Sequence, residues 1–190
     1  MARALTISRF RIPFAEARKY EGMLEAPKSV AEGVDGYIST SVWREVNDRD
    51  SYLRLTFFRD VTAMDQFYDK INRSQALIDS INKYGIAPDV QRCEVFELIR
   101  MAPNRIHESE FLSLSIRAMD PGHGVDWAEK LSMNLQEVST IPGFEGAAVA
   151  SGESVPDEIV GLALWQSPDS FKRSVPDRPD YEISLYELYR

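Results

Sequence analysis

Val-Asp-Gly-Tyr at residues 34–37 recurs as Ile-Pro-Gly-Phe at residues 141–144, an offset of 107 positions (37 to 144). The same offset relates four pairs of large side chains: Tyr20 and Trp127, Leu24 and Leu131, Leu55 and Leu162, and Phe58 and Trp165. Because the offset persists through a helical pattern, a turn and a strand pattern, it indicates a duplicated unit of about a hundred residues. Repeats of that length are domains, so we expect two similar domains in this chain.

The duplication sets the domain boundaries. We predict a first repeat at residues 1–100, a linker at 101–107 that contains Pro103, and a second repeat at 108–190. Hydrophobic residues make up 44% of the 190-residue chain, which suits ordinary packed cores. The chain is therefore expected to fold as two small, well-packed units.

Each repeat is predicted to have the element order β-α-β-β-α-β of the ferredoxin-like fold. The expected strands lie at 6–12, 37–46, 52–59 and 93–99 in the first repeat, and at 110–117, 143–151, 159–167 and 183–189 in the second. Glu97 corresponds to Glu187 at an offset of 90 rather than 107, so 17 residues are missing around the second helix of repeat 2. Repeat 1 is therefore expected to carry the longer helical cover.

Turn and cap residues predict where the helices of repeat 1 begin and end. The first helix should begin near Pro13, and Pro27 should kink or end it. Thr62 is the expected N-cap of the second helix, and Gly85 is its expected stop. A single helical stripe should connect them: Met64, Phe67, Ile71, Ile78 and Ile81.

The helices of repeat 2 are predicted in the same way. Trp127, Leu131, Leu135 and Val138 mark the first, and Asp126 with Glu129 has capping-box spacing at its start. A short second helix should begin at residues 167–170 and end before Pro176.

Alternation along residues 53–58 predicts a strand that is buried on both faces. Leu53, Leu55 and Phe57 share a fully apolar face, while Arg54 and Phe58 lie on the opposite one. Helices cover only one face of a ferredoxin-like sheet, so the apolar faces of the two sheets should pack together. Arg54 then faces the helices, where a buried charge needs a partner or a ligand. A salt bridge to Glu97 or to another strand carboxylate is the structural alternative.

The composition excludes several classes of function. The formal net charge is −8, and no basic run is present, which disfavours binding to nucleic acid. Cys93 is the only cysteine, so no internal disulfide can form and a reducing compartment is expected. No apolar run has the length of a signal peptide core or a membrane span. We expect a cytoplasmic protein without a membrane partner.

Few residues have the pattern of a recognisable reactive site. No phosphate-binding loop, dinucleotide fingerprint or nucleophile elbow is present, and the residue spacing predicts no metal site. His123 at the start of a helix can act as an acid or base, although a solvated loop histidine is the commoner case, and more so for His107. Cys93 is expected to be a small buried residue. Trp43 and Arg44, near a strand end, suit an interface or a pocket mouth.

The repeats resemble the antibiotic biosynthesis monooxygenase family of dimeric α+β barrels. The resemblance rests on Pro-Gly-Phe at 142–144, on Leu-Ala-Leu-Trp-Gln-Ser-Pro-Asp-Ser-Phe at 162–171 and on Tyr-Glu-Ile at 181–183. Repeat 1 matches more weakly, at 36–37 and 55–60. Because family members usually pair as homodimers, the resemblance implies an α+β fold in which two ferredoxin-like repeats form an intramolecular dimeric barrel. Further homo-oligomerisation stays open.

The resemblance also implies a function. Some members of the family are cofactor-free oxygenases that hold an electron-rich aromatic substrate beside the tryptophan of the third strand, which corresponds to Trp165. The asparagine of such enzymes is replaced by Gly161 here and by Arg54 in repeat 1. Their tyrosine is replaced by Phe171 and, in repeat 1, by Met64. Haem-degrading relatives need a histidine in the second helix, and neither repeat has one there.

Two functional hypotheses follow. The first is a monooxygenase-like protein that acts on an aromatic or quinol-like small molecule without a metal or nucleotide cofactor. The second is a non-catalytic binding or regulatory protein on the same scaffold. The predicted substrate-binding residues are Arg54, Phe58, Trp165 and Phe171, with core packing as the alternative for Trp165. We expect only one repeat to hold a ligand-sized cavity, with repeat 1 slightly favoured.

Overall fold

The computed structural model describes residues 2–176, 179 and 181–189; for residues 21–26, 76, 77, 80, 81 and 84 it describes the backbone alone. The strands are β1 (Ala4–Arg11), β2 (Tyr37–Glu45), β3 (Ser51–Phe58), β4 (Asp89–Ile99), β5 (Phe111–Ala118), β6 (Phe144–Gly152), β7 (Glu158–Trp165) and β8 (Ser184–Leu188). The α-helices are α1 (Glu21–Glu32), α2 (Val61–Asn72), α3 (Gln75–Tyr84), α4 (Gly124–Val138) and α5 (Pro168–Ser174). The 3-10 helices are η1 (Phe14–Tyr20) and η2 (Pro103–Glu108).

The strands form one closed antiparallel barrel in the order β1-β3-β2-β8-β5-β7-β6-β4. The four N-terminal strands are contiguous in this ring, as are the four C-terminal ones. Two junctions join these halves: β2 pairs with β8 and β4 pairs with β6. Closure gives each described strand a neighbour on both sides along at least part of its length. The expected contact between two sheets therefore also involves hydrogen bonds between their edges.

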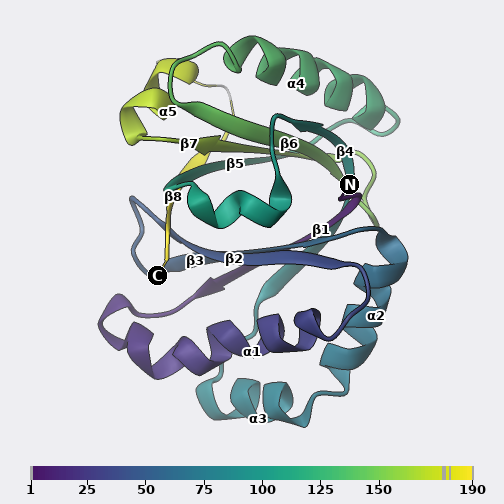
Figure 1. The fold of residues 1–190 in the computed structure, drawn as a ribbon, viewed down its shortest axis with the longest axis vertical. Coiled ribbons are helices and arrows are strands. Elements are labelled where there is room, and N and C mark those ends of the chain that lie inside the picture. The colour runs from purple at the N-terminus through teal and green to yellow at the C-terminus, as the bar shows by residue number, and fades with distance from the viewer. Residues whose placement is uncertain (1, 177–178, 180, 190) are drawn as a thin grey trace.

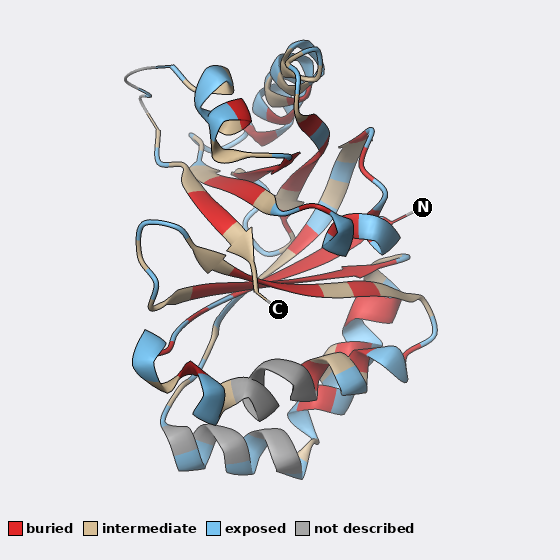
Figure 2. Ribbon diagram, turned by 60° about the vertical axis from the view of Figure 1, so that its left-hand side comes forward, coloured by how far each residue is buried: buried red, intermediate tan, exposed pale blue. Residues whose placement is uncertain are grey.

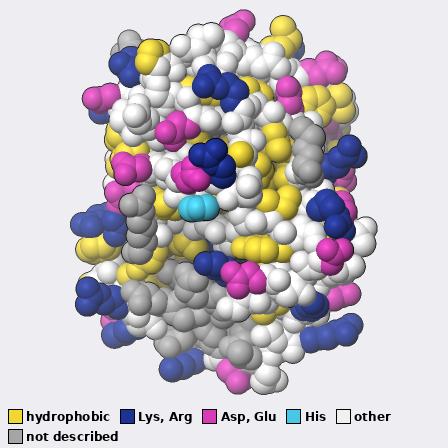
Figure 3. All heavy atoms as spheres, viewed as in Figure 1, with side chains coloured by type: hydrophobic (Ala, Val, Ile, Leu, Met, Phe, Trp, Pro, Cys, Tyr) yellow, Lys and Arg dark blue, Asp and Glu magenta, His cyan; other side chains and the backbone are white. Residues whose placement is uncertain are grey.

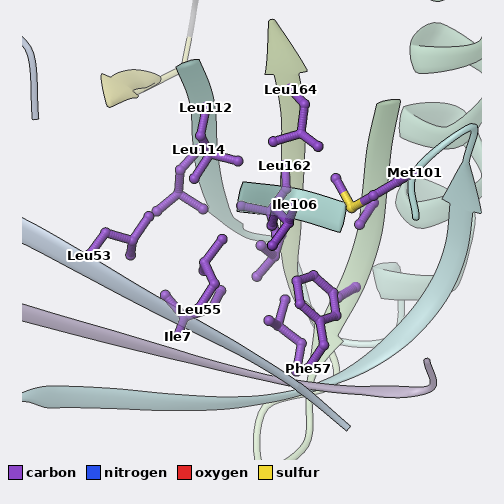
Figure 4. Packing of buried hydrophobic residues seen from close by; sticks show 14 of the residues in the cluster. Ile7, Leu53, Leu55, Phe57, Met101, Ile106, Leu112, Leu114, Leu162 and Leu164 are labelled. Carbon is purple, nitrogen blue, oxygen red and sulfur yellow. The ribbon is translucent and has the colours of Figure 1, made fainter. Parts of the chain in front are cut away.

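The interior of the barrel is the main hydrophobic core. Leu53, Leu55 and Phe57 point into it, as the alternation along β3 predicts. Figure 4 shows these side chains meeting Leu112, Leu114, Leu162 and Leu164 from the opposite half. Both halves therefore contribute to one core, and their apolar faces are buried against each other.

The helices lie outside the barrel, with α1, α2 and α3 over the N-terminal strands and α4 and α5 over the C-terminal strands (Figure 1). Buried residues follow the strands and the helix turns that face them, while the outer helix surfaces are exposed (Figure 2). Each half of the barrel therefore has a second layer between its sheet and its helices. Arg54 and Trp165, two of the predicted site residues, lie in these layers.

Two expectations for the helices of the N-terminal half differ from the structure: Pro27 does not end its helix, and Thr62 is not the N-cap of the next one. Pro27 lies inside α1, which continues to Glu32. A proline removes one backbone donor, and burial of Ala31 and Val34 against α2 and the sheet holds the end of the helix in place. In addition, Asp60 rather than Thr62 caps α2, because its carboxylate accepts a hydrogen bond from Ala63 N at 2.9 Å.

The predicted stripe between Thr62 and Gly85 is also divided between two helices. The helix α2 ends at Asn72, and α3 begins at Gln75. Arginine and serine at 73–74 occupy the break, where a serine competes with helical hydrogen bonding. Of the stripe, Met64, Phe67 and Ile71 are buried and Ile78 is exposed. The side chains of Ile81 and Leu24 lie outside the described residues.

The start of α4 differs from the predicted capping box. His123 is the N-cap residue, and it makes no side-chain cap hydrogen bond. Asp157, which precedes β7, instead accepts hydrogen bonds from Gly122 N at 3.0 Å and from Gly124 N at 2.9 Å. The carboxylate that caps α4 is therefore distant in sequence. The short helix of this half follows its prediction, since Ser167 caps α5 and the helix ends at Ser174.

The segment predicted to link the two repeats is an ordered part of the core. Its 3-10 helix η2 lies between the two halves (Figure 1) and packs on β2. Ile106 is 1% exposed and points into the interior cluster (Figure 4). Ser39 Oγ donates a hydrogen bond to the Pro103 carbonyl oxygen at 2.6 Å. The segment therefore ties both halves together.

Candidate functional site

A pocket of about 440 Å³ lies between α4 and the C-terminal strands. Its floor is the helix-facing surface of β5 and β7, and one wall is the apolar side of α4. The segment between α5 and β8 contributes Tyr181 to the opposite side. The volume falls in the range of sites for small organic ligands, about 300–1,000 Å³. Among the predicted site residues, Trp165 lines this pocket.

Trp165 is both a core residue and a pocket wall. Its side chain is buried, and its ring meets Phe144 and Phe171 edge-on, with centroids 5.5 Å and 6.1 Å away. The indole Nε1 donates a hydrogen bond to Ser113 Oγ at 2.9 Å, which fixes the orientation of the ring. Phe171 thus supports Trp165 from α5. The two sequence interpretations of Trp165 do not exclude one another.

Gly161 leaves open the space in front of this wall. A Cβ atom at this position would lie 3.0 Å from Ser115 Oγ and 3.1 Å from Leu131 Cδ2. Contacts of that length require the neighbours to move, so a larger side chain would occupy the pocket. The absence of a side chain at this position therefore leaves the site larger than any other residue would.

Arg117 supplies the positive charge of the pocket. It follows Ser113 and Ser115 on the same face of β5, and its guanidinium lies 3.6 Å from the centre of the Tyr181 ring. Its Nε is buried and has no hydrogen-bond partner among the described residues. Sequence reasoning missed this arginine, although the alternation of β5 places it on the surface that the serines share.

Arg54 lies in the N-terminal half, on the surface of β3 that faces the helices. The residue is 7% exposed. Its Nη2 lies 3.4 Å from Ser8 Oγ, and its guanidinium lies 5.9 Å from the centre of the Phe10 ring. Burial lowers the pKa of Arg54 to about 10, which still leaves the side chain charged at neutral pH.

The predicted alternative, a salt bridge between Arg54 and Glu97, is wrong. Glu97 instead accepts hydrogen bonds from Ser132 and from Gln136 Nε2, the latter at 3.1 Å, both on α4. The pairing of β4 with β6 shifts in register between Val95 and Glu97. Beyond this shift, Glu97 pairs with Val149 of the C-terminal half. Within the described part of the chain, no carboxylate forms an ion pair with Arg54.

Phe58 shares the surface of Arg54 but belongs to the packing under α2. Its ring centre lies 5.3 Å from that of Phe67, in a cluster that includes Met64 and Ile71. The expectation that only one repeat holds a ligand-sized cavity, with repeat 1 slightly favoured, stays a prediction, because several side chains of α1 and α3 lie outside the described residues. In the described residues, the lining of the 440 Å³ pocket belongs to the C-terminal half.

The remaining candidates are accounted for by the fold. Cys93 is fully buried, and burial raises the pKa of its thiol to about 12, which agrees with a small core residue. Trp43 points into the barrel interior rather than to a pocket mouth, because β2 continues the ring through β8. Arg44 Nε donates to Glu187 at 3.0 Å across that junction. His107 and His123 are exposed.

The described residues contain no cluster of histidine, cysteine and acidic side chains that could hold a metal ion. Basic and acidic side chains are interspersed on the face shown in Figure 3. No helix in the described part of the chain has the length and apolar character to cross a membrane.

The fold is similar to that of several solved structures. A candidate monooxygenase from Fusobacterium nucleatum matches 100% of this chain and 93% of its own, with a TM-score of 0.71 and 10% identity. An anthrone oxidase-like protein matches 99% of this chain and 92% of its own, with a TM-score of 0.69 and 15% identity. A major regulator of staphylococcal pathogenesis matches 99% and 100%, with a TM-score of 0.62 and 9% identity.

No protein-family model and no curated protein matches the sequence. The structural matches extend over the whole chain at identities that establish the fold alone. They confirm the α+β barrel that the sequence resemblance implies. The chain has the closed α+β barrel fold of the monooxygenase-like proteins.

Proposed function

We propose that the chain binds an electron-rich aromatic compound in the pocket beside Trp165 and acts on it as a monooxygenase without a metal or nucleotide cofactor. We also infer that the two halves are ferredoxin-like repeats from one duplication. Their strand orders, β4-β1-β3-β2 and β8-β5-β7-β6, support this inference, and so does the 107-residue offset. The single chain would then replace a homodimer.

The observation that carries the functional proposal is the composition of the pocket. Trp127, Trp165 and Tyr181 offer aromatic surfaces to a flat ligand, and Gly161 leaves room for it. Ser115 and Arg117 are the polar groups on the floor. An apolar pocket with a few convergent polar groups is typical of a site for a small organic molecule.

The proposed reaction needs no external reductant. A methylene between two aromatic rings is oxidised to a carbonyl, R₂CH₂ + O₂ → R₂C=O + H₂O, and the substrate supplies all the electrons. Loss of a proton from the substrate gives an anion that reduces oxygen. Arg117 would stabilise the negative charge on that anion, and Glu137 at the pocket lining would accept the proton.

A non-catalytic ligand-binding protein is the second candidate. One observation favours it: Gly161 and Phe171 place no polar group where the family's oxygenases have an asparagine and a tyrosine. The fold of the staphylococcal regulator is compatible with such a role. Both candidates use the same pocket, so turnover rather than binding separates them.

The test uses anthrone, a compound with the required methylene, and the Gly161→Leu variant, which fills the pocket. The matched control is Val155→Leu at an exposed position, where the residue is 54% exposed. We expect anthrone to quench tryptophan fluorescence and to be consumed together with oxygen by the wild type and by the control, but not by Gly161→Leu. Binding without consumption would support the second candidate. Unchanged binding by Gly161→Leu would exclude this pocket.

A further inference from the structure

Arg54 forms a second polar centre, in the half of the barrel that the proposed oxygenase pocket does not use. It is 7% exposed in the middle of β3. Its described contacts are a hydroxyl, Ser8 Oγ at 3.4 Å, and an aromatic ring, Phe10 at 5.9 Å. A buried guanidinium without a carboxylate is rare, because burial of an uncompensated charge is strongly unfavourable. This charge therefore needs an explanation.

The groups around Arg54 are donors rather than counter-charges. The helix-facing surface carries a row of buried hydroxyls on β1 and β3, from Thr6, Ser8 and Thr56. Thr40 Oγ1 lies 3.1 Å from Thr56 Oγ1 and extends the row onto β2. Each hydroxyl can donate a hydrogen bond but carries no negative charge.

Tyr68 of α2 approaches this row of hydroxyls from the helical layer, near Thr6 and Arg54. Burial raises the pKa of its phenol to about 12, while the nearby charges of Arg92 and Arg54 and the hydroxyl of Thr6 act in the opposite direction. The phenol is therefore a neutral donor at physiological pH. Arg92, in turn, is neutralised by Asp65 and Glu153, so its charge is already compensated. Arg54 has no such pair among the described residues.

Apolar side chains flank this polar row. Phe10 stacks on Tyr52 on one side, with ring centres 5.9 Å apart, and Phe58 packs on Phe67 on the other. A ligand of this layer would place an anionic group on Arg54 and an apolar body against the rings. One arginine surrounded by neutral donors matches a group with a single negative charge and two acceptor oxygens.

From this arrangement we infer that the N-terminal half holds a separate binding site in which Arg54 receives the carboxylate of a small aromatic acid. The two halves carry different residues at the positions that surround this site. Position 161, the counterpart of Arg54, is glycine, and Phe10 corresponds to Arg117. A serine occupies the same position in each half, Ser8 in one and Ser115 in the other. The arginine thus comes from β3 in one half and from β5 in the other, so the two sites would hold their ligands differently.

The test measures binding of benzoate, 1-naphthoate and 2-naphthoate by calorimetry, with 1-naphthamide as the uncharged match. We expect at least one carboxylate to bind, the amide to bind at least tenfold more weakly, and Arg54→Met to lose at least tenfold in affinity for that carboxylate. Arg11→Met is the matched control, because Arg11 is an exposed arginine on β1. Gly161→Leu should bind the carboxylate normally, which separates this site from the proposed oxygenase pocket.

Thermal unfolding distinguishes a ligand site from a structural charge. Without ligand, Arg54→Met should unfold at the same or a higher temperature than the wild type, since it removes an uncompensated buried charge. Ser8→Ala keeps the arginine and should weaken carboxylate binding several-fold. A large fall in the melting temperature of Arg54→Met would assign the arginine to the fold. Absence of carboxylate binding that depends on Arg54 and Ser8 would also overturn the inference.

Discussion

Truncation of Ile106 to alanine tests whether the linker is part of the barrel core. Ile106 is 1% exposed and packs in the cluster that both halves share. The change removes three buried carbon groups, worth about 0.8 kcal/mol each, and leaves a cavity. We therefore expect the free energy of unfolding to fall by about 3 kcal/mol, within the range of about 2–5 kcal/mol for such truncations.

The assay is equilibrium unfolding in urea, followed by tryptophan fluorescence and by circular dichroism. Val125→Ala is the matched control, since Val125 is 65% exposed and its truncation should change stability by less than about 0.5 kcal/mol. The two probes should give coincident transitions, because one core spans both halves. A loss below about 1 kcal/mol for Ile106→Ala would refute the packing described for η2. Separate transitions would refute the shared core.

Three further predictions concern the site and its surroundings. Gly161→Leu should reduce binding of anthrone at least tenfold while the far-ultraviolet circular dichroism stays that of the wild type, because the leucine occupies the space beside Ser115. Asp157→Asn should destabilise the protein at neutral pH. The backbone hydrogen bonds from Gly122 and Gly124 lower the pKa of Asp157, so the wild-type advantage should be present above about pH 4 and disappear as the pH falls through the lowered value. Cys93 should resist a thiol reagent in the native protein and react once urea unfolds it, since burial raises its pKa to about 12; rapid native labelling would contradict its placement.

Local patterns predicted the strands and their faces well. The alternation along β3 placed Leu53, Leu55 and Phe57 in the interior and Arg54 toward the helices, and the structure confirms both. Such a pattern is reliable because successive side chains of a strand must point to opposite sides. The fixed offset likewise aligned Phe58 with Trp165, which face the helical layers of their halves.

Features that depend on distant partners were not predictable in this way. Asp157 caps a helix that begins more than thirty positions earlier, and its two backbone bonds exist only after folding. Glu97 is an equally clear case, because the irregularity in β4 aligns it with α4 instead of Arg54. Pro27 within α1 shows that tertiary packing overrides a local helix signal.

The candidate site was predicted in part. Family resemblance singled out Trp165, which lines the pocket, and Phe171, which supports it. Arg117 and Tyr181 were missed as a pair, since their contact joins β5 to a segment far along the chain. Two of the pocket's polar floor residues could still have been found, because Ser115 and Arg117 alternate on one face of a predicted strand.

Incorporation of isotopic oxygen into the product distinguishes oxygenase activity from ligand binding alone. Protein freed of metals and nucleotides would be mixed with anthrone under ¹⁸O₂, and the product analysed by mass spectrometry. We expect one labelled oxygen atom in each carbonyl product, formed faster than in buffer by the wild type and at the buffer rate by Gly161→Leu. A wild-type rate equal to that of buffer, with anthrone bound in the pocket, would contradict oxygenase activity and leave the protein as a ligand-binding barrel.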